Sequence, residues 1–149
     1  MLKKKLLLIS IITIILIGIF HFLALKYSWY WSFRWIDIPM HIIGGFWVSI
    51  TVLWVSLKIG HIESINGYKK KALLVILGSV LIVAIFWELF ELIFKITSLH
   101  DIGYWKDSLC DILNTFIGGV VGFLYFTKNK KAKRPAIIDR KVRNNFAVI

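Results

Sequence analysis

The chain has 149 residues, of which 58% are hydrophobic and 18% are charged, and its formal net charge is +11. A soluble domain of this length could not bury so much apolar surface without exposing large patches, so part of its solvent is lipid. Two prolines and a single cysteine exclude collagen-like and disordered chains and disulfide-stabilised scaffolds.

Four apolar runs predict four membrane-spanning helices. The first, residues 6–25, follows three lysines and can cross ~30 Å of hydrocarbon at ~1.5 Å per residue, which favours an uncleaved signal anchor over a cleaved signal peptide. The second covers residues 38–59, with Asp37 expected as the N-cap. The third and fourth cover residues 72–94 and 108–126.

The length of these runs decides the fold class. They do not alternate and are too long for the strands of a membrane barrel. The sequence therefore predicts an all-α polytopic membrane protein with four transmembrane helices. We expect one transmembrane domain over residues 1–126 and a basic cytoplasmic tail over residues 127–149.

The distribution of Lys and Arg predicts the orientation, because these residues are enriched in cytoplasmic loops. With a cytoplasmic N-terminus, fifteen of the nineteen basic residues lie inside, and the four outside are Lys26, Arg34, Lys95 and Lys106. This bias predicts an N-in/C-in protein of the cell membrane. It also explains the net charge as a topology signal, so we expect membrane lipid and no nucleic acid as a partner.

The acidic residues gather on the opposite side of the membrane. Six of the eight acids lie at or near the predicted outer face: Asp37, Glu88, Glu91, Asp101, Asp107 and Asp111. An acid at mid-membrane costs roughly 2.5–3.5 kcal/mol, so such residues usually face the bundle interior and find partners. Two glutamates one turn apart cannot both ionise cheaply there, which predicts a proton, a metal or a basic ligand group beside them.

The spacing of the polar residues predicts one shared site on three helices. Asp37 and His41 are four residues apart, and Glu88 and Glu91 are three apart, so each pair shares a helix face. On the fourth run a single stripe contains Asp107, Asp111, Asn114, Gly118 and Gly122. These faces predict an acid/His vestibule that opens outward, centred on Glu88 and Glu91 with His41 and Asp111.

Glycines continue two of these faces below the polar positions. Small residues in such stripes let membrane helices approach closely. The glycines expected to pack the helices are Gly44, Gly45, Gly118 and Gly122. The sequence thus predicts a bundle that closes tightly beneath the vestibule.

The order of the three polar motifs resembles a known group of proteins. Asp37-x-x-x-His41, Glu88-x-x-Glu91 and Asp107-x-x-x-Asp111-x-x-Asn114 are similar to the motifs of VanZ-like membrane proteins, and at least as similar to those of the YjdF-type family. The resemblance covers about residues 35–122. It implies a small bacterial or archaeal envelope protein; VanZ-like members are associated with glycopeptide resistance, and no reaction is established for them.

Three functions remain open from the sequence. The polar residues could form a structural network that fixes the helix register. They could bind or transport a cation, a proton, a lipid or an envelope precursor, although four helices are few for transport without a homo-oligomer. They could also form a membrane-interface enzyme for a lipid or isoprenoid-linked substrate, with a divalent cation held by His41, Glu88, Glu91 and Asp111, a donor set that suits Mg²⁺, Mn²⁺ or Zn²⁺. The ligand, the cofactor and the enzymatic status are left undecided.

Overall fold

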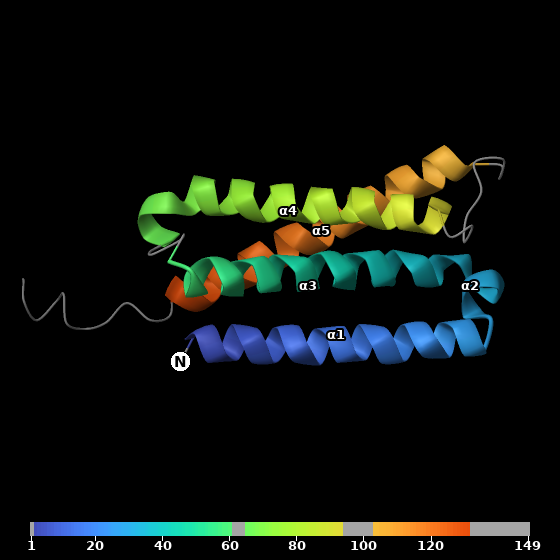
Figure 1. The fold of residues 1–149 in the computed structure, drawn as a ribbon, viewed down its shortest axis with the longest axis horizontal. Coiled ribbons are helices and arrows are strands. Elements are labelled where there is room, and N and C mark those ends of the chain that lie inside the picture. Colours follow the sequence, from blue (N-terminus) through green and yellow to red (C-terminus); the bar gives the residue numbers. More distant parts are fainter. Residues whose placement is uncertain (1, 61–64, 94–102, 132–149) are drawn as a thin grey trace, which may run out of the picture.

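A computed structural model describes residues 2–60, 65–93 and 103–131, and over these residues the chain is helical without any strand. Its elements are α1 (Leu2–Lys26), α2 (Trp29–Ser32), a 3-10 turn η1 (Arg34–Ile36), α3 (Asp37–Lys58), α4 (Ile65–Ile93) and α5 (Tyr104–Lys131). In this described part, four helices are long and apolar enough to cross a membrane. They run side by side, with the start of α1 and the end of α5 at the same end (Figure 1). The predicted all-α, four-span fold is confirmed.

The helices extend beyond the apolar runs that predicted them, because charged residues continue the helical turns at the membrane surface. Helix α5 reaches Lys131, so the first residues of the predicted tail are helical. The N-cap prediction for Asp37 was wrong: Ile36 holds that position, with helical φ and ψ, and no side chain caps the helix. The 3-10 turn before α3 already carries the backbone in a helical conformation, so Asp37 becomes the first helical residue.

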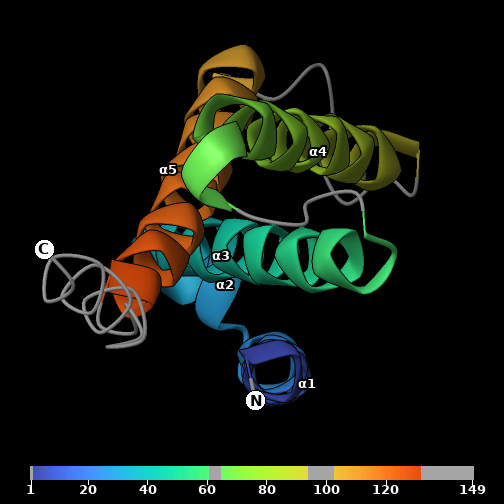
Figure 2. The same ribbon diagram turned by 90° about the vertical axis from the view of Figure 1, so that its left-hand side faces the viewer.

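Helix α3 is the central element of the bundle. It packs against α1, α4 and α5, and its contact with α5 is the most extensive in the described chain. Figure 2 shows α1 lying on one side of α3, with α4 on the other side and α5 crossing beside both. The apolar faces of α1 and α4 that do not meet these partners are exposed, as expected for helices surrounded by lipid.

The contact between α3 and α5 depends on two glycines. A Cβ added to Gly45 on α3 would overlap the backbone carbonyl of Thr115, and one added to Gly118 on α5 would overlap the carbonyl of Ile42. At this crossing the two backbones are therefore in direct contact, which only residues without a side chain permit. Gly45 and Gly118, two of the glycines predicted to pack the helices, thus lie where the two backbones approach most closely.

The other two predicted packing glycines differ from each other. A Cβ on Gly122 would lie 2.7 Å from the Oγ atom of Ser49, so Gly122 extends the close crossing by one turn. No atom lies within 4 Å of the Cβ position of Gly44, so the packing predicted for Gly44 is not found. Gly44 and Gly45 are neighbours about 100° apart around α3, and only one of them can face α5.

The apolar core fills the bundle from its middle to the end that carries the N-terminus. Its buried members come from all four long helices: Leu6, Val48, Ile50, Leu53, Leu57, Ala72, Ile76, Val80, Phe123 and Phe126. One polar contact ties α1 to this core, a hydrogen bond of 2.7 Å between the hydroxyls of Ser10 and Thr51. The buried charged groups, Glu88 and Asp111, lie at the opposite end.

Candidate metal centre

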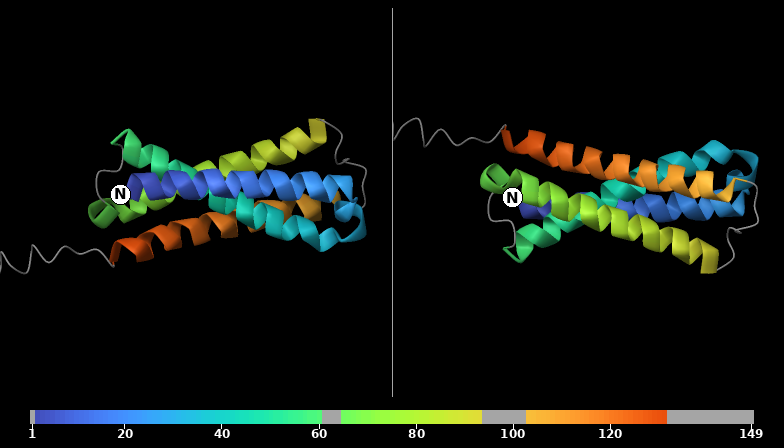
Figure 3. Two further views of the ribbon diagram at one scale, coloured as in Figure 1. Left: turned by 90° about the horizontal axis from the view of Figure 1, so that it is seen from below. Right: turned by 90° about the horizontal axis from the view of Figure 1, so that it is seen from above.

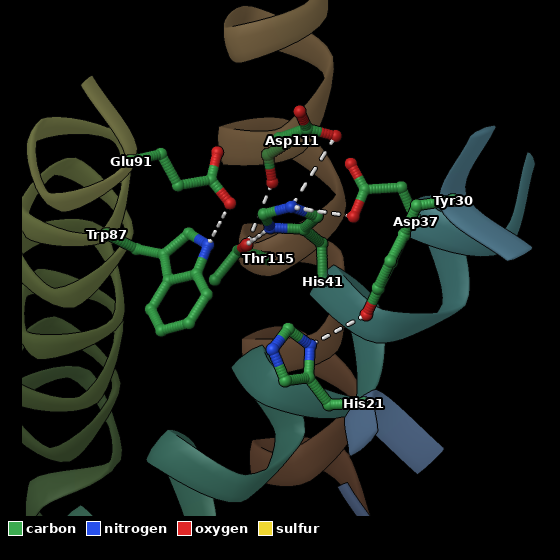
Figure 4. Close-up of polar contacts among 8 residues, drawn as sticks. All are labelled: His21, Tyr30, Asp37, His41, Trp87, Glu91, Asp111 and Thr115. Atoms are coloured by element: carbon green, nitrogen blue, oxygen red, sulfur yellow. Dashed lines mark hydrogen bonds and ion pairs between the residues drawn. The ribbon is translucent and has the colours of Figure 1, made fainter. Parts of the chain in front are cut away.

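Three polar side chains from two helices meet at the end of the bundle opposite the start of α1 and the end of α5. Asp37 begins α3, His41 follows one turn later, and Asp111 lies in the second turn of α5 (Figure 4). The Nε2 atom of His41 is 3.5 Å from Oδ1 of Asp37 and 3.8 Å from Oδ1 of Asp111. One ligand atom from each of the three residues lies within 4.8 Å of the other two, close enough to hold one metal ion.

The other ring nitrogen of His41 is fixed by Thr115. Its Nδ1 atom is 3.2 Å from Oγ1 of Thr115, and that hydroxyl donates a hydrogen bond of 2.8 Å to the backbone carbonyl of Asp111. Because a hydroxyl has one proton to donate, Thr115 can only accept from His41, so Nδ1 carries the hydrogen. In the neutral imidazole the lone pair of Nε2 would then point at two carboxylates.

This arrangement requires a proton or a metal cation between Nε2 and the two carboxylates. A lone pair that faces two anions is repelled, and burial strengthens the repulsion because little water screens it. A second proton on the ring, a proton on one of the carboxylates, or a metal cation between Nε2 and the carboxylates removes the conflict. The site is thus built to hold a proton or a metal cation.

The three side chains differ in their access to solvent. The side chains of His41 and Asp111 are 9% and 10% exposed, whereas that of Asp37 is 39% exposed. Directly beneath His41, the contact of Gly45 with Thr115 closes the space between α3 and α5. Of the three side chains, that of Asp37 is therefore the most open to solvent.

Only part of the polar stripe predicted on α5 lies on the buried face of that helix. Asp107 is exposed and Asn114 is half-buried, while Ser108 and Thr115 are buried together with Asp111. Positions 107 and 114 flank position 111 on one side of the helix and positions 108 and 115 on the other. Sequence reasoning missed Thr115, although a hydroxyl four residues after Asp111 and three before Gly118 was a signal for it.

Glu88 and Glu91 surround the centre without joining it. The carboxylate of Glu88 is buried and hydrogen-bonded to Ser108, and Glu91 accepts a hydrogen bond of 2.8 Å from Nε1 of Trp87. Both carboxylates are within electrostatic range of His41, but neither is among the ligand atoms that come together. Of the four predicted metal ligands, the structure brings together His41 and Asp111 and adds Asp37 to them.

A second polar contact holds the segment that precedes α3. Tyr30 on α2 places its hydroxyl 2.9 Å from Nδ1 of His21 on α1 (Figure 4). Burial raises the pKa of Tyr30 to about 12, with smaller contributions from the negative charges of Asp37 and Glu91. The phenol therefore keeps its proton, and its hydrogen bond with His21 ties α2 to α1.

The comparison with known families now identifies the chain. The sequence model of a family described as predicted membrane protein (DUF2238) matches residues 3–132. The chain belongs to this family. The DUF2238 match covers the four long helices except for the first residue of α1, includes Asp37, His41 and Asp111, and its description gives a membrane location without an activity. No curated protein and no solved structure matches the chain.

Proposed function

We propose that this DUF2238 protein binds one divalent metal cation at Asp37, His41 and Asp111. The observation that carries the proposal is the setting of the His41 ring, whose Nε2 faces two carboxylates while its Nδ1 hydrogen is held by Thr115. Histidines that bind metals almost always donate their second ring N–H to a fixed acceptor, which selects the tautomer and orients the ring. Thr115 supplies that acceptor here.

The distances between the three side chains support a metal ion over a distant electrostatic pair. Around a tetrahedral ion with ligands at ~2.0–2.2 Å, neighbouring ligand atoms lie about 3.3–3.6 Å apart. The separations of 3.5 and 3.8 Å from Nε2 to the two carboxylates need only a small side-chain adjustment to meet this value. One imidazole with two carboxylates suits Zn²⁺ or Mn²⁺ better than Mg²⁺, which prefers oxygen ligands and water.

The open side of the centre indicates what else the ion would contact. Three protein ligands leave at least one coordination position free, as in catalytic rather than structural zinc sites. The free position would face the solvent-exposed side of the centre at Asp37, near the headgroup level of the membrane. We therefore place the lipid headgroup or envelope precursor expected from the sequence at this position, and a metal-dependent enzyme acting on such a lipid is the second candidate function.

The cellular setting is part of the same proposal. The lysines of the described chain that lie at the end with the N-terminus include Lys3, Lys58 and Lys71, while Lys26 and Lys106 lie at the other end. By the positive-inside rule this favours cytoplasmic termini and a metal centre that faces outward from a prokaryotic cell membrane. The order of the polar motifs supports a relationship to VanZ-like and YjdF-type proteins.

Metal content and metal titration of the purified protein test the proposal. The chain, stripped with EDTA in detergent, is titrated with Zn²⁺, Mn²⁺ and Mg²⁺ and analysed by elemental mass spectrometry. We expect about one Zn²⁺ or Mn²⁺ per chain, lost in Asp111→Asn. Asp107→Asn is the matched control, since it removes the same charge from an exposed position one turn away on α5. Absence of binding, or equal loss in both variants, would refute the metal centre.

The structural network left open by the sequence has a distinct signature. If His41 carries two protons instead of a metal, its ion pairs with Asp37 and Asp111 hold α3 against α5. Asp111→Asn would then lower the thermal stability, and EDTA would have no effect on the wild type. A bound metal instead stabilises the fold by about 2.7 kcal/mol at a concentration of ~100 times its Kd, and EDTA removes that gain.

A further inference from the structure

An open groove lies between α3 and α4 at the end of the bundle opposite the metal centre. It has a volume of about 360 Å³. Its walls are formed by Thr51, Val52, Val55 and Ser56 on α3, by Ile59 directly after α3, and by Val75 and Ser79 on α4. The two helices cross, so that the end of α3 and the beginning of α4 diverge (Figure 3). The groove thus opens sideways, toward the lipid that surrounds the bundle.

Two of the three hydroxyls that line this groove are already engaged by the protein. Ser79 donates a hydrogen bond of 2.8 Å to the carbonyl of Val75, and Thr51 is bonded to Ser10 at 2.7 Å. The walls therefore present mainly the aliphatic side chains of Val55, Val75 and Ile59 to a bound molecule. Such a surface matches a hydrocarbon chain and gives no reason for water or a polar ligand to enter.

The rim of the groove carries positive charge. Lys58 is exposed in the last turn of α3, next to Ile59, and its Nζ lies 5.2 Å from the ring centroid of Trp54. Lys71 is exposed on α4 one turn before Val75, on the same helix face, and Lys70 precedes it. Every acid in the described chain lies at the other end of the bundle, so no described carboxylate neutralises this rim.

We infer that this groove binds an anionic phospholipid, with an acyl chain along α3 and α4 and the phosphate at Lys58 and Lys71. The inference combines an apolar channel that opens to lipid with cations where a headgroup would lie. Basic pockets between membrane helices recognise acidic headgroups in this way. The site is separate from the metal centre and does not depend on it.

Native mass spectrometry of the full chain tests this inference. The detergent-purified protein is mixed with equal amounts of dioleoyl-phosphatidylglycerol and dioleoyl-phosphatidylcholine, which differ only in the headgroup. We expect the phosphatidylglycerol to be retained preferentially. The double variant Lys58→Gln/Lys71→Gln should weaken its binding about 30-fold, because each lysine near an anionic headgroup contributes a factor of about 5.

Two further variants separate this site from a general attraction to the basic end. Lys3→Gln/Lys4→Gln removes the same charge from exposed positions of α1 at the same end and should leave lipid retention unchanged. Val55→Phe fills the groove and should reduce retention of both lipids while the rim keeps its charge. Equal loss in the two lysine pairs, equal binding of the two lipids, or a dimer that Val55→Phe dissociates would overturn the inference.

Discussion

The crossing of α3 and α5 places the three residues of the proposed metal centre, so a single methyl group at the crossing should disturb the centre. In Gly118→Ala the new Cβ would lie 2.8 Å from the carbonyl carbon of Ile42, where ordinary contact begins at 3.4 Å. Both groups are attached directly to helical backbone and neither can rotate away. The helices must therefore separate by at least about 0.6 Å at this point, the difference between these two distances.

This separation is large enough to break the contact that orients His41. The distance from its Nδ1 to Oγ1 of Thr115 is 3.2 Å and would grow to at least about 3.8 Å, beyond hydrogen-bond range. Loss of such an orienting partner typically weakens metal affinity 10–100-fold. Overpacking of this kind costs typically ~1–3 kcal/mol, so the thermal stability of the metal-free protein should fall as well.

Gly44→Ala is the matched control, because the same substitution one residue from the crossing adds a methyl group where no atom lies within 4 Å. Metal affinity by calorimetry and thermal unfolding by tryptophan fluorescence are measured for both variants in the same detergent. We expect both quantities to fall in Gly118→Ala and neither to fall in Gly44→Ala. Unchanged metal affinity in a destabilised Gly118→Ala would refute the link between the crossing and the centre.

Two further substitutions test the groups that surround the centre. Thr115→Val keeps the shape of the side chain but leaves Nδ1 of His41 without its acceptor, so zinc affinity measured by calorimetry should fall 10–100-fold, and Thr115→Ser should restore it. Tyr30→Phe should remove a phenol that ionises near pH 12, seen as the loss of one late step in the absorbance titration at 295 nm. Since folding raises this pKa from 10.0, the stability that protonated Tyr30 contributes is complete below pH 10 and is lost as pH rises toward 12. A difference titration centred near pH 10 would contradict the burial of Tyr30.

The four-span fold could be predicted because it depends on the length and hydropathy of each segment of the sequence. The length and apolarity of each run set the number of spans, and these do not depend on how the helices pack. The small-residue positions Gly45 and Gly118 were also readable, since helices in lipid approach most closely where side chains are smallest. The exact helix ends were less readable, because lysines at the start of α1 and the end of α5 continue helices that hydropathy alone would stop.

The site was harder to predict because it depends on how each helix is rotated about its own axis. The spacing of residues in the sequence does not determine this rotation. On α5, a shift of one residue in the buried face exchanges Asn114 for Thr115 while Asp111 stays inside. On α4, the spacing of Glu88 and Glu91 puts them on one face, but their distance from His41 follows from where α4 crosses α5. Local partners, Ser108 for Glu88 and Trp87 for Glu91, then satisfy both carboxylates away from the centre.

Glu88 and Glu91 lie close to the proposed metal centre although neither carboxylate is one of its ligands. Their position indicates what two acids that are costly to bury contribute there. A carboxylate that ligated the ion directly would fill the free coordination position. Held by Ser108 and Trp87, Glu88 and Glu91 instead act on His41 only through space. Such a pair of acids raises the local concentration of cations beside the centre without occupying the ion's open side. The arrangement therefore fits a centre that must both attract a cation and leave it able to bind a ligand.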